Sequence, residues 1–192
     1  MYRVNEIFRS LQGEGYWTGT PMVFVRMSGC NLQCPFCDTD HASHTAMTAE
    51  DIVNEALALA GDCRRICLTG GEPALQLDDA LLSAFHTAGF RVHIETNGTR
   101  ALPEGVDWIT LSPKEDVPGL KGDGRVVLRK ADELKLVYTG DDAVVDRWAG
   151  FPADWHFLQP CSCANTGETV ACILSRAVWR LSLQTHKYLG IR

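Results

Sequence analysis

The sequence predicts an α/β fold in which parallel strands form a partial (β/α) barrel with trimmed helices. The first observation is that strand-like and helix-like stretches alternate, which is typical of parallel strands joined by right-handed crossovers. The second is the length, because 192 residues fall short of the roughly 250 of a complete eight-stranded barrel. This length also favours a single domain over residues 1–192.

The elements follow in chain order from their residue patterns. Residues 22–27, MVFVRM, are apolar and partly β-branched, so they predict a buried strand. In the next stretch, TAEDIVNEALALAG, Thr48 and Asp51 fit a helical capping box and Gly61 fits the left-handed C-terminal turn. A strand that begins at about Ile66 then ends in a glycine turn. The later elements are a helix at 77–89, strands at 90–98, 108–114, 133–138 and 156–160, a helix at 141–150 and a terminal helix at 169–189.

Composition argues against several classes of protein. Net charge is −6 and basic residues form no block, so a nucleic-acid binder is not expected. No stretch approaches the roughly 18 apolar residues of a membrane span, and the start lacks the pattern of a signal peptide. We therefore expect a cytoplasmic protein that makes no membrane contact. Thiols stay reduced there, so the eight cysteines indicate metal binding or reactive chemistry rather than disulfides.

Polar and glycine-rich segments stand where five of the predicted strands end. In parallel α/β folds this edge binds ligands, because the loops that follow the strands converge there. The irregular stretch 112–132 is placed to form a loop over such a site. The segments are Cys30, Gly70–Pro73, Glu95–Asn97, Ser112–Lys114 and Gln159–Pro160.

Cys30, Cys34 and Cys37 lie on one loop, close enough in sequence for their thiolates to share a metal centre. A structural zinc site needs a fourth ligand. The candidates for that ligand are Asp38, His41 and His44. A four-iron cluster held by three cysteines instead leaves one iron open to a substrate or cofactor. On this motif alone, zinc and iron–sulfur are about equally favoured.

Two further features favour the iron–sulfur interpretation. Phe36 lies where its ring would pack on an adenine, and the segment TGGEP offers open backbone groups and a carboxylate for an ammonium. The three-cysteine loop together with Gly70-Gly71-Glu72-Pro73 resembles the radical S-adenosylmethionine superfamily. The resemblance implies a [4Fe–4S] cluster whose fourth iron is chelated by the amino and carboxylate groups of S-adenosylmethionine. It also implies a 5′-deoxyadenosyl radical that abstracts a substrate hydrogen.

Other stretches, from residue 6 to the C-terminus, resemble the 7-carboxy-7-deazaguanine synthase family. They are EIFRSLQGEG, FVRMSGCNLQCPFCDT, LTGGEP, IETNG, SPK, LQP and LQTHKYLGIR. The resemblance implies a lyase on the pathway to queuosine that converts 6-carboxy-5,6,7,8-tetrahydropterin to 7-carboxy-7-deazaguanine with loss of ammonia. Hydrogen would be taken from C6, Mg²⁺ would organise the rearranging intermediate, and S-adenosylmethionine would be regenerated rather than consumed.

The same resemblance implies roles for single residues. Arg26 would hold the substrate carboxylate through a planar, two-pronged contact, and the Thr39 hydroxyl would ligate Mg²⁺. The implied substrate residues are Leu11, Gln12, Gly13, Glu14, Arg26, Thr69, His186 and, through the C-terminal carboxylate, Arg192. The implied S-adenosylmethionine residues are Phe36, Cys37, Asp38, Gly71, Glu95, Ser112, Pro113, Lys114 and Gln159.

Several residues lie outside these motifs. We interpret Cys67 and Cys172 as small buried apolar residues and Lys135 as a solvated side chain. An auxiliary cluster is the alternative reading of the remaining thiols. Its ligands would be Cys63, Cys161, Cys163 and Cys172.

Two other functions remain as alternatives. A glycyl-radical enzyme activase shares the three-cysteine loop but needs a docking surface for a large protein. A zinc-binding interaction module would use the same cysteines without catalysis. The partners expected for the synthase are the pterin substrate, an electron donor such as flavodoxin or ferredoxin, and a second copy in a homodimer.

Overall fold

A computed structural model describes residues 1–37, 39–40 and 42–192. The strands are β1 (Tyr2–Leu11), β2 (Pro21–Met27), β3 (Thr45–Met47), β4 (Arg65–Gly70), β5 (Arg91–Thr96), β6 (Trp108–Leu111), β7 (Ala131–Tyr138), β8 (Ala153–Pro160) and β9 (Trp179–Leu181). The α-helices are α1 (Ala49–Ala60), α2 (Asp79–Thr87), α3 (Asp142–Trp148), α4 (Thr166–Leu174) and α5 (Thr185–Leu189). Short 3₁₀ turns, η1 (Pro73–Leu75) and η2 (Cys161–Cys163), follow β4 and β8.

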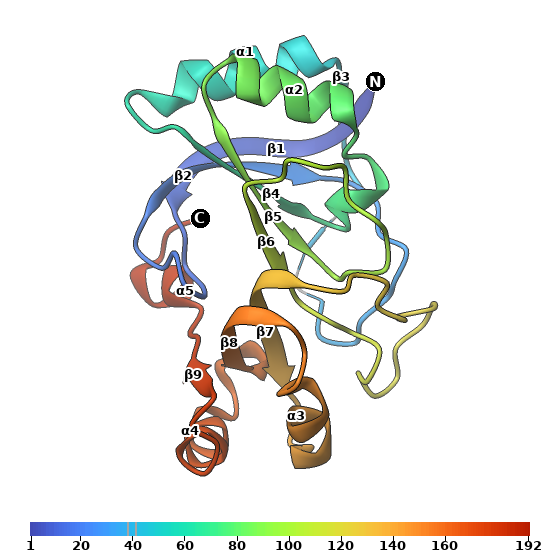
Figure 1. Ribbon diagram of the computed structural model, residues 1–192. Helices are drawn as coiled ribbons and strands as arrows, with labels where there is room; N and C mark the ends of the chain where they lie inside the picture. The colour runs from blue at the N-terminus through green and yellow to red at the C-terminus, as the bar shows by residue number, and fades with distance from the viewer. Residues whose placement is uncertain (38, 41) are drawn as a thin grey trace.

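All of these strands belong to one sheet with the order β3-β1-β2-β4-β5-β6-β7-β8-β9. From β2 to β9 every neighbouring pair is parallel, whereas β1 is antiparallel to both β2 and β3. The sheet curls around a hollow side but does not close, because β3 and β9 remain separate edges (Figure 1). The predicted partial barrel is therefore confirmed, with an antiparallel strand pair added at one edge.

Helices cover the convex face of this sheet (Figure 1). α1 and α2 pack beside each other over β1, β2 and β5, while α3 and α4 cover β7 and β8. Alternate residues of each strand point to that layer, so Ile66 and Leu68 of β4 are fully buried in the core beneath α1 and α2. A second apolar cluster around Leu134 and Leu158 lies under α3 and α4. The residues between them face the hollow side.

The amino end of α1 follows the predicted capping, whereas the left-handed turn predicted at Gly61 is not formed. The Thr48 hydroxyl accepts a hydrogen bond from the Asp51 amide, and the Asp51 carboxylate accepts one from the Thr48 amide, which confirms the capping box of α1. Gly61 has a positive φ of 57° but a ψ of −117°, so it ends the helix without entering the left-handed helical region. The irregular stretch between β6 and β7 contains no helix or strand of its own.

The predictions miss β1, which has ten residues. A β-bulge shifts its register between Val4 and Glu6. Val4 and Ile7 therefore both pack toward the helices, although they are three residues apart, while Glu6 and Phe8 face the hollow side. This break in the two-residue alternation hides the strand pattern in the sequence.

The predicted terminal helix at 169–189 is wrong. α4 ends at Leu174, the chain then forms β9 beside β8, and only a short α5 follows. Trp179 pairs with His156 in register and is 3% exposed in the core under α4. A continuous helix would withdraw this indole from the core and leave β8 without its second neighbour.

Candidate active site

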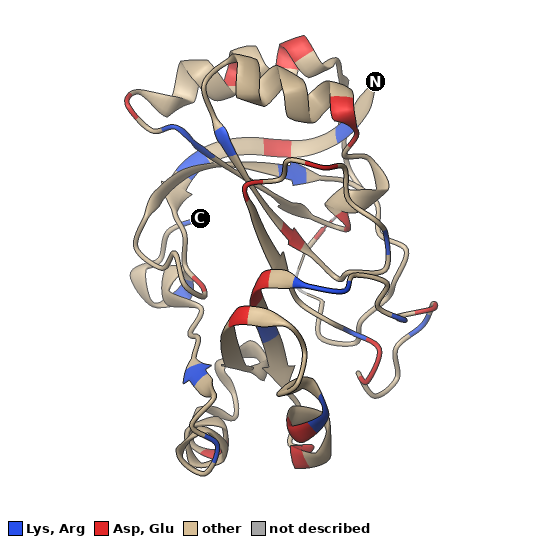
Figure 2. Cartoon of the chain, viewed as in Figure 1, with Lys and Arg blue, Asp and Glu red and all other residues tan. Residues whose placement is uncertain are grey.

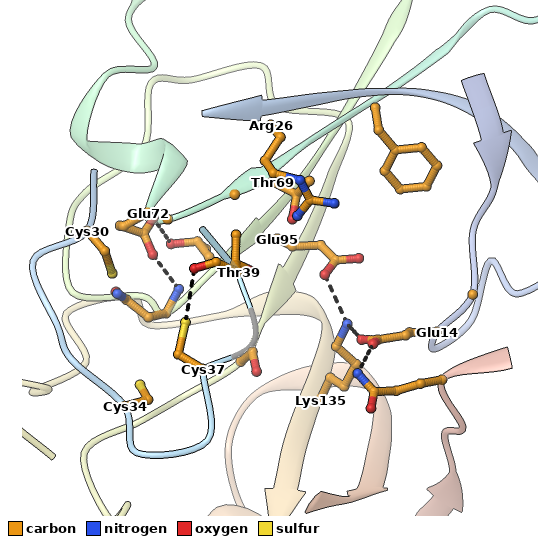
Figure 3. Close-up of a pocket in the computed structure, with 18 of the residues that line it drawn as sticks. Glu14, Arg26, Cys30, Cys34, Cys37, Thr39, Thr69, Glu72, Glu95 and Lys135 are labelled. Atoms are coloured by element: carbon orange, nitrogen blue, oxygen red, sulfur yellow. Dashed lines mark hydrogen bonds and ion pairs between the residues drawn. The ribbon is translucent and has the colours of Figure 1, made fainter. Parts of the chain in front are cut away.

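A cavity of about 540 Å³ opens on the hollow side of the sheet at the carboxyl ends of the parallel strands. Members of the predicted strand-end segments after β2, β4, β5, β6 and β8 all line it. The expected convergence of these loops is thus confirmed. The cavity extends from the three-cysteine loop at one end to Glu14 and the C-terminal tail at the other (Figure 3).

The polar character of the cavity wall comes from the strand alternation. Arg26, Thr69, Glu95, Lys135 and Gln159 lie on five different strands and all point to the cavity. The residue that precedes each of them in sequence packs toward the helices instead, so the sheet separates an apolar core from a charged interior.

The cysteine loop forms one end of the cavity, and all three of its thiols line it. The Cys37 amide donates to the Cys34 carbonyl at 3.1 Å, and Leu32, 2% exposed, anchors the loop in the interior. Burial raises the pKa of the Cys30 and Cys34 thiols, and the charge of nearby Cys37 raises both further. Three thiols that face one cavity and affect one another's ionisation fit a shared cluster.

The irregular stretch after β6 lies against this loop, as expected. The Gln33 amide donates to the Lys121 carbonyl at 2.9 Å, and the reverse bond is 3.2 Å. The Lys114 ammonium donates to both the carbonyl and the hydroxyl of Ser112, at 2.7 and 2.6 Å. Burial lowers the pKa of Lys114, although the charge of Cys34 opposes that shift. Lys114 thus places a positive charge beside the cysteine loop.

The glycine turn after β4 packs backbone to backbone against the cysteine loop. The Gly71 amide donates to the Met27 carbonyl and the Glu72 amide to the Gly29 carbonyl, at 3.0 and 2.9 Å. A Cβ on Gly71 would lie 2.0 Å from the Gly29 oxygen, so only glycine allows this approach. This turn therefore determines where the loop that carries Cys30 begins.

The suggestion that Glu72 holds an ammonium needs correction. Its side chain is 1% exposed, and its carboxylate accepts hydrogen bonds from the Thr96 hydroxyl at 2.6 Å and the Asn97 amide at 2.7 Å. A third bond comes from the Ala74 amide at 2.9 Å. Burial raises the pKa of this carboxyl group despite these bonds. Glu72 ties the ends of β4 and β5 together beneath the cavity.

The interpretation of Lys135 as solvated is also wrong. Its side chain is 4% exposed, and its ammonium contacts Glu14 at 2.5 Å and Glu95 at 3.0 Å (Figure 3). Gln184 donates to the other Glu14 oxygen at 2.9 Å. The alternation of β7, with apolar Leu134 and Leu136 on the opposite face, was the signal that could have placed this lysine inside.

The pKa values of two buried carboxyl groups, Glu14 and Glu133, are shifted in opposite directions. Burial alone would raise the pKa of Glu14, but the Lys135 ammonium and its hydrogen bonds lower that pKa to about 2. Burial raises the pKa of Glu133 to about 7, only partly offset by Lys135. Glu133 accepts a hydrogen bond from the Tyr16 amide at 3.1 Å. Glu14 is therefore an anion at neutral pH, while Glu133 exchanges its proton near neutrality.

The C-terminal tail closes the far end of the cavity. The amide and the hydroxyl of Thr185 both donate to the Gly13 carbonyl at 2.9 Å. His186 packs so closely over Gly13 that an added Cβ would lie 2.2 Å from its Nδ1. The main-chain oxygen of Arg192 accepts a hydrogen bond from the Ser10 hydroxyl at 2.5 Å. The predicted tail residues thus reach the cavity, although by a different local structure than expected.

Two arginines meet at one carboxylate beside the tail. The Arg26 Nε contacts Glu6 at 2.9 Å and an Arg192 Nη contacts the other Glu6 oxygen at 2.7 Å. Both guanidinium groups also lie over the Phe8 ring, at 5.7 and 5.4 Å from its centre. Glu6 and Phe8, which the sequence interpretation did not single out, therefore orient the positive groups at this end.

Most other candidate residues also line the cavity. These are Leu11, Gln12, Gly13, Phe36, Thr39, Ser112 and Gln159. Pro113 is buried but is not part of the cavity wall. Asp38, as well as the alternative zinc ligand His41, lies outside the described residues.

Lysines and arginines are scattered among acidic residues along the described chain (Figure 2).

The five cysteines outside the loop are dispersed. Cys63 lies just before the amino end of β4, whereas Cys161 and Cys163 follow the carboxyl end of β8. Because these strands are parallel, Cys63 lies at the opposite end of the strands from Cys161 and Cys163, which is incompatible with an auxiliary cluster that joins them. Cys67 and Cys172 are 1% and 5% exposed, which confirms their interpretation as buried residues.

A parallel half-open barrel with a three-cysteine loop after its first parallel strand defines a radical S-adenosylmethionine enzyme. Residues 24–118 match the model of the Radical SAM superfamily. The fold alone is also similar to that of SuiB from Streptococcus suis, with a TM-score of 0.56, 20% identity, and coverage of 81% of this chain and 47% of that chain.

Similarity to known proteins over the whole length of the chain identifies one family within this class. The chain is 52% identical to the 7-carboxy-7-deazaguanine synthase of Bacteroides thetaiotaomicron over 100% of both chains, and 45% identical to that of Caulobacter vibrioides over 99% of both. The crystal structure of QueE from Escherichia coli has a TM-score of 0.80 and 30% identity, covering 96% of this chain and 94% of that chain. The chain belongs to the 7-carboxy-7-deazaguanine synthase family.

Proposed function

We propose that this chain is a radical S-adenosylmethionine lyase that converts 6-carboxy-5,6,7,8-tetrahydropterin to 7-carboxy-7-deazaguanine and ammonia, within one domain that spans residues 1–192. The observation that carries the proposal is one cavity that joins three thiols of a single loop to an arginine-bearing pocket for a small anion. Full-length similarity to synthases supports the same reaction and disfavours the activase and the zinc module.

The cofactors of this class are a [4Fe–4S] cluster and S-adenosylmethionine, which together supply a 5′-deoxyadenosyl radical and take it back after the reaction. We assign the cluster to Cys30, Cys34 and Cys37, whose thiols border the cavity. Phe36 and Lys114 line the wall beside them. The cofactor residues proposed further along the wall are Cys37, Gly71, Glu95, Ser112 and Gln159, with Asp38 and Pro113 next to them in sequence.

The substrate occupies the other end in this proposal. The Arg26 guanidinium donates through its Nε to Glu6, and its remaining N–H groups are available to bind the carboxylate of the pterin. The Glu14 carboxylate accepts hydrogen bonds from the edge of the heterocycle, and the Gln12 side-chain amide donates to it. Leu11 and Gly13 pack on its ring. The remaining contacts are Thr69, His186 and the C-terminal carboxylate of Arg192.

We also propose that Mg²⁺ binds beside the cysteine loop with the Thr39 hydroxyl as its protein ligand. Thr39 lines the cavity together with Asp40, so both the ion and the substrate oxygens can reach it. Magnesium keeps several waters and takes few protein ligands, which suits a single hydroxyl completed by substrate oxygens.

The proposal includes partners and location. Reductive cleavage requires an electron from outside, so we infer a donor such as flavodoxin or ferredoxin. Exposed apolar side chains in the last third of the chain, including Leu174 and Tyr188, support a homodimer. All eight cysteines are free, which suits the reducing cytoplasm. Among the described residues, every helix is too short or too polar to cross a membrane.

The test is an anaerobic assay of the cluster-reconstituted full chain with dithionite, S-adenosylmethionine, Mg²⁺ and 6-carboxytetrahydropterin. We expect mass spectrometry to detect 7-carboxy-7-deazaguanine with wild type and none with Cys34→Ala, whose iron content should fall. Cofactor cleavage without this product would retain the radical enzyme and reject the pterin. Absence of both from protein with about four irons and sulfide per chain would reject the whole proposal.

A second variant separates the synthase from an activase. Arg26→Ala should raise the KM for the pterin by about 100-fold, because a bidentate charged contact is lost. Slow cleavage of S-adenosylmethionine should persist, since Arg26 lies at the substrate end. An unchanged KM would place the substrate carboxylate elsewhere.

A further inference from the structure

Lys135 connects the two ends of the proposed substrate and cofactor sites. It projects from β7, whereas Glu95 projects from β5 and Glu14 from the turn after β1. Its ammonium contacts both carboxylates, at 2.5 Å for Glu14 and 3.0 Å for Glu95. The first of these carboxylates belongs to the proposed substrate pocket and the second to the proposed cofactor pocket.

These contacts are part of a closed ring of hydrogen bonds. The Gln12 side-chain amide donates to the second Glu95 oxygen at 2.8 Å, and its own oxygen accepts from the Glu14 amide at 3.1 Å. The ring therefore runs from Lys135 to Glu95, through Gln12 to Glu14, and back to Lys135. A closed ring fixes the relative positions of its members more strongly than separate pairs do.

Electrostatics requires a positive charge between the two carboxylates of this ring. Glu14 and Glu95 face the same interior, with side chains only 14% and 23% exposed. Without the ammonium, two carboxylates would share a poorly solvated space, and their repulsion would move them apart or protonate one of them. An apolar residue at position 135 fills the same space but cannot hold both groups.

We propose that Lys135 is a positioning residue that fixes the distance between the S-adenosylmethionine site and the pterin site. The proposal rests on the proposed function and adds to it. Hydrogen abstraction requires the reacting carbon of each molecule to be held near contact distance, and a displacement of about 1 Å costs about 100-fold in rate. Lys135 acts through Glu14 and Glu95.

The primary test compares Lys135→Met with Glu133→Gln in the reconstituted full chain. Glu133 is the matched control, because it is a buried ionisable residue on the same face of the same strand and holds the Tyr16 amide. Deazaguanine product and free 5′-deoxyadenosine are measured together. Lys135→Met should lower the ratio of product to 5′-deoxyadenosine by about 100-fold, whereas Glu133→Gln should keep the wild-type ratio.

A pH profile separates positioning from a merely structural role. With Lys135 removed, burial raises the pKa of Glu14, so its anion is lost as pH falls. The kcat/KM for the pterin of Lys135→Met should therefore fall as pH is lowered through a range in which wild type, whose Glu14 has a pKa of about 2, keeps this anion. Other ionisable groups facing the pair are Glu133 on β7, Lys114 after β6, His186 on α5 and Cys67 on β4.

The outcomes are distinct. If wild type makes product while Lys135→Met keeps its ratio and pH profile, the positioning role is rejected and the proposed function stands. If wild type with a full cluster makes no product, both are rejected. Should Lys135→Met fail to fold or bind iron, the double variant Glu14→Gln, Lys135→Met removes the opposing charge as well. It should show the same uncoupling without the added pH dependence, and a wild-type ratio would reject positioning.

Discussion

The two ends of the cavity are built differently. At the cysteine end, two turns that follow neighbouring strands meet through their main chains, with Gly71 against Gly29. At the substrate end, side chains from the turn after β1, from β7 and from the tail meet through charges and hydrogen bonds. A backbone contact tolerates almost no added atom, whereas a side-chain network can move but must remain balanced in charge. The same kind of substitution should therefore affect the two ends unequally.

The largest effect is expected from Gly71→Ala. The added methyl meets the Gly29 carbonyl oxygen at 2.0 Å, so the cysteine loop itself must shift. We expect bound iron to fall by more than half and product formation to fall about 100-fold, because the thiols no longer converge. Iron analysis and the anaerobic assay measure both.

The control for this substitution is Gly167→Ala in α4, where an added methyl has no neighbour within 4 Å. Its iron content and activity should equal those of wild type. A Gly71→Ala protein with a full complement of iron would show that the two turns are not rigidly connected.

A smaller effect is expected from the equivalent substitution at the other end, Gly13→Ala. Its methyl meets the His186 ring at 2.2 Å, and a side chain can rotate away where a backbone cannot. We expect the KM for the pterin to rise about tenfold, with bound iron unchanged, since a displaced tail residue costs about 1.4 kcal/mol. Loss of iron in this variant would contradict the independence of the two ends.

The smallest effect on the reaction is expected from Glu133→Gln, which should change only how the stability of the fold depends on pH. Glu133 has a folded pKa of about 7, above its ordinary value of 4.5, so the folded protein binds a proton that the unfolded chain has released between these values. Stability from this group is complete below about pH 4.5 and is lost as pH rises through 7. Glu133→Gln should remove this loss.

Thermal denaturation at about pH 5 and pH 8 measures that difference. Relative to wild type, Glu133→Gln should gain about 2 to 3 kcal/mol more at the higher pH than at the lower. An equal difference at both values would mean that Glu133 stays ionised, and that Lys135 neutralises it as it does Glu14.

Local residue patterns were sufficient for much of this molecule. The strand MVFVRM, the capping box of Thr48 and Asp51, and the three-cysteine loop depend on neighbours in the chain, and all were predicted. The convergence of the strand-end segments on one cavity also followed, because parallel strands share the edge at which their loops emerge. Family resemblance added the tail residues, which no local pattern indicated.

Long-range packing decided the rest. β1 escaped prediction because its bulge breaks the alternation, and β9 because its place depends on the open edge of β8. Lysine is usually a surface residue. The burial of Lys135 is favourable only because its ammonium meets Glu14 and Glu95, which are 121 and 40 positions away in the sequence. A charge is stable inside a protein only when opposite charges meet it there. That meeting depends on the arrangement of strands in space, which neighbouring residues in the sequence do not specify.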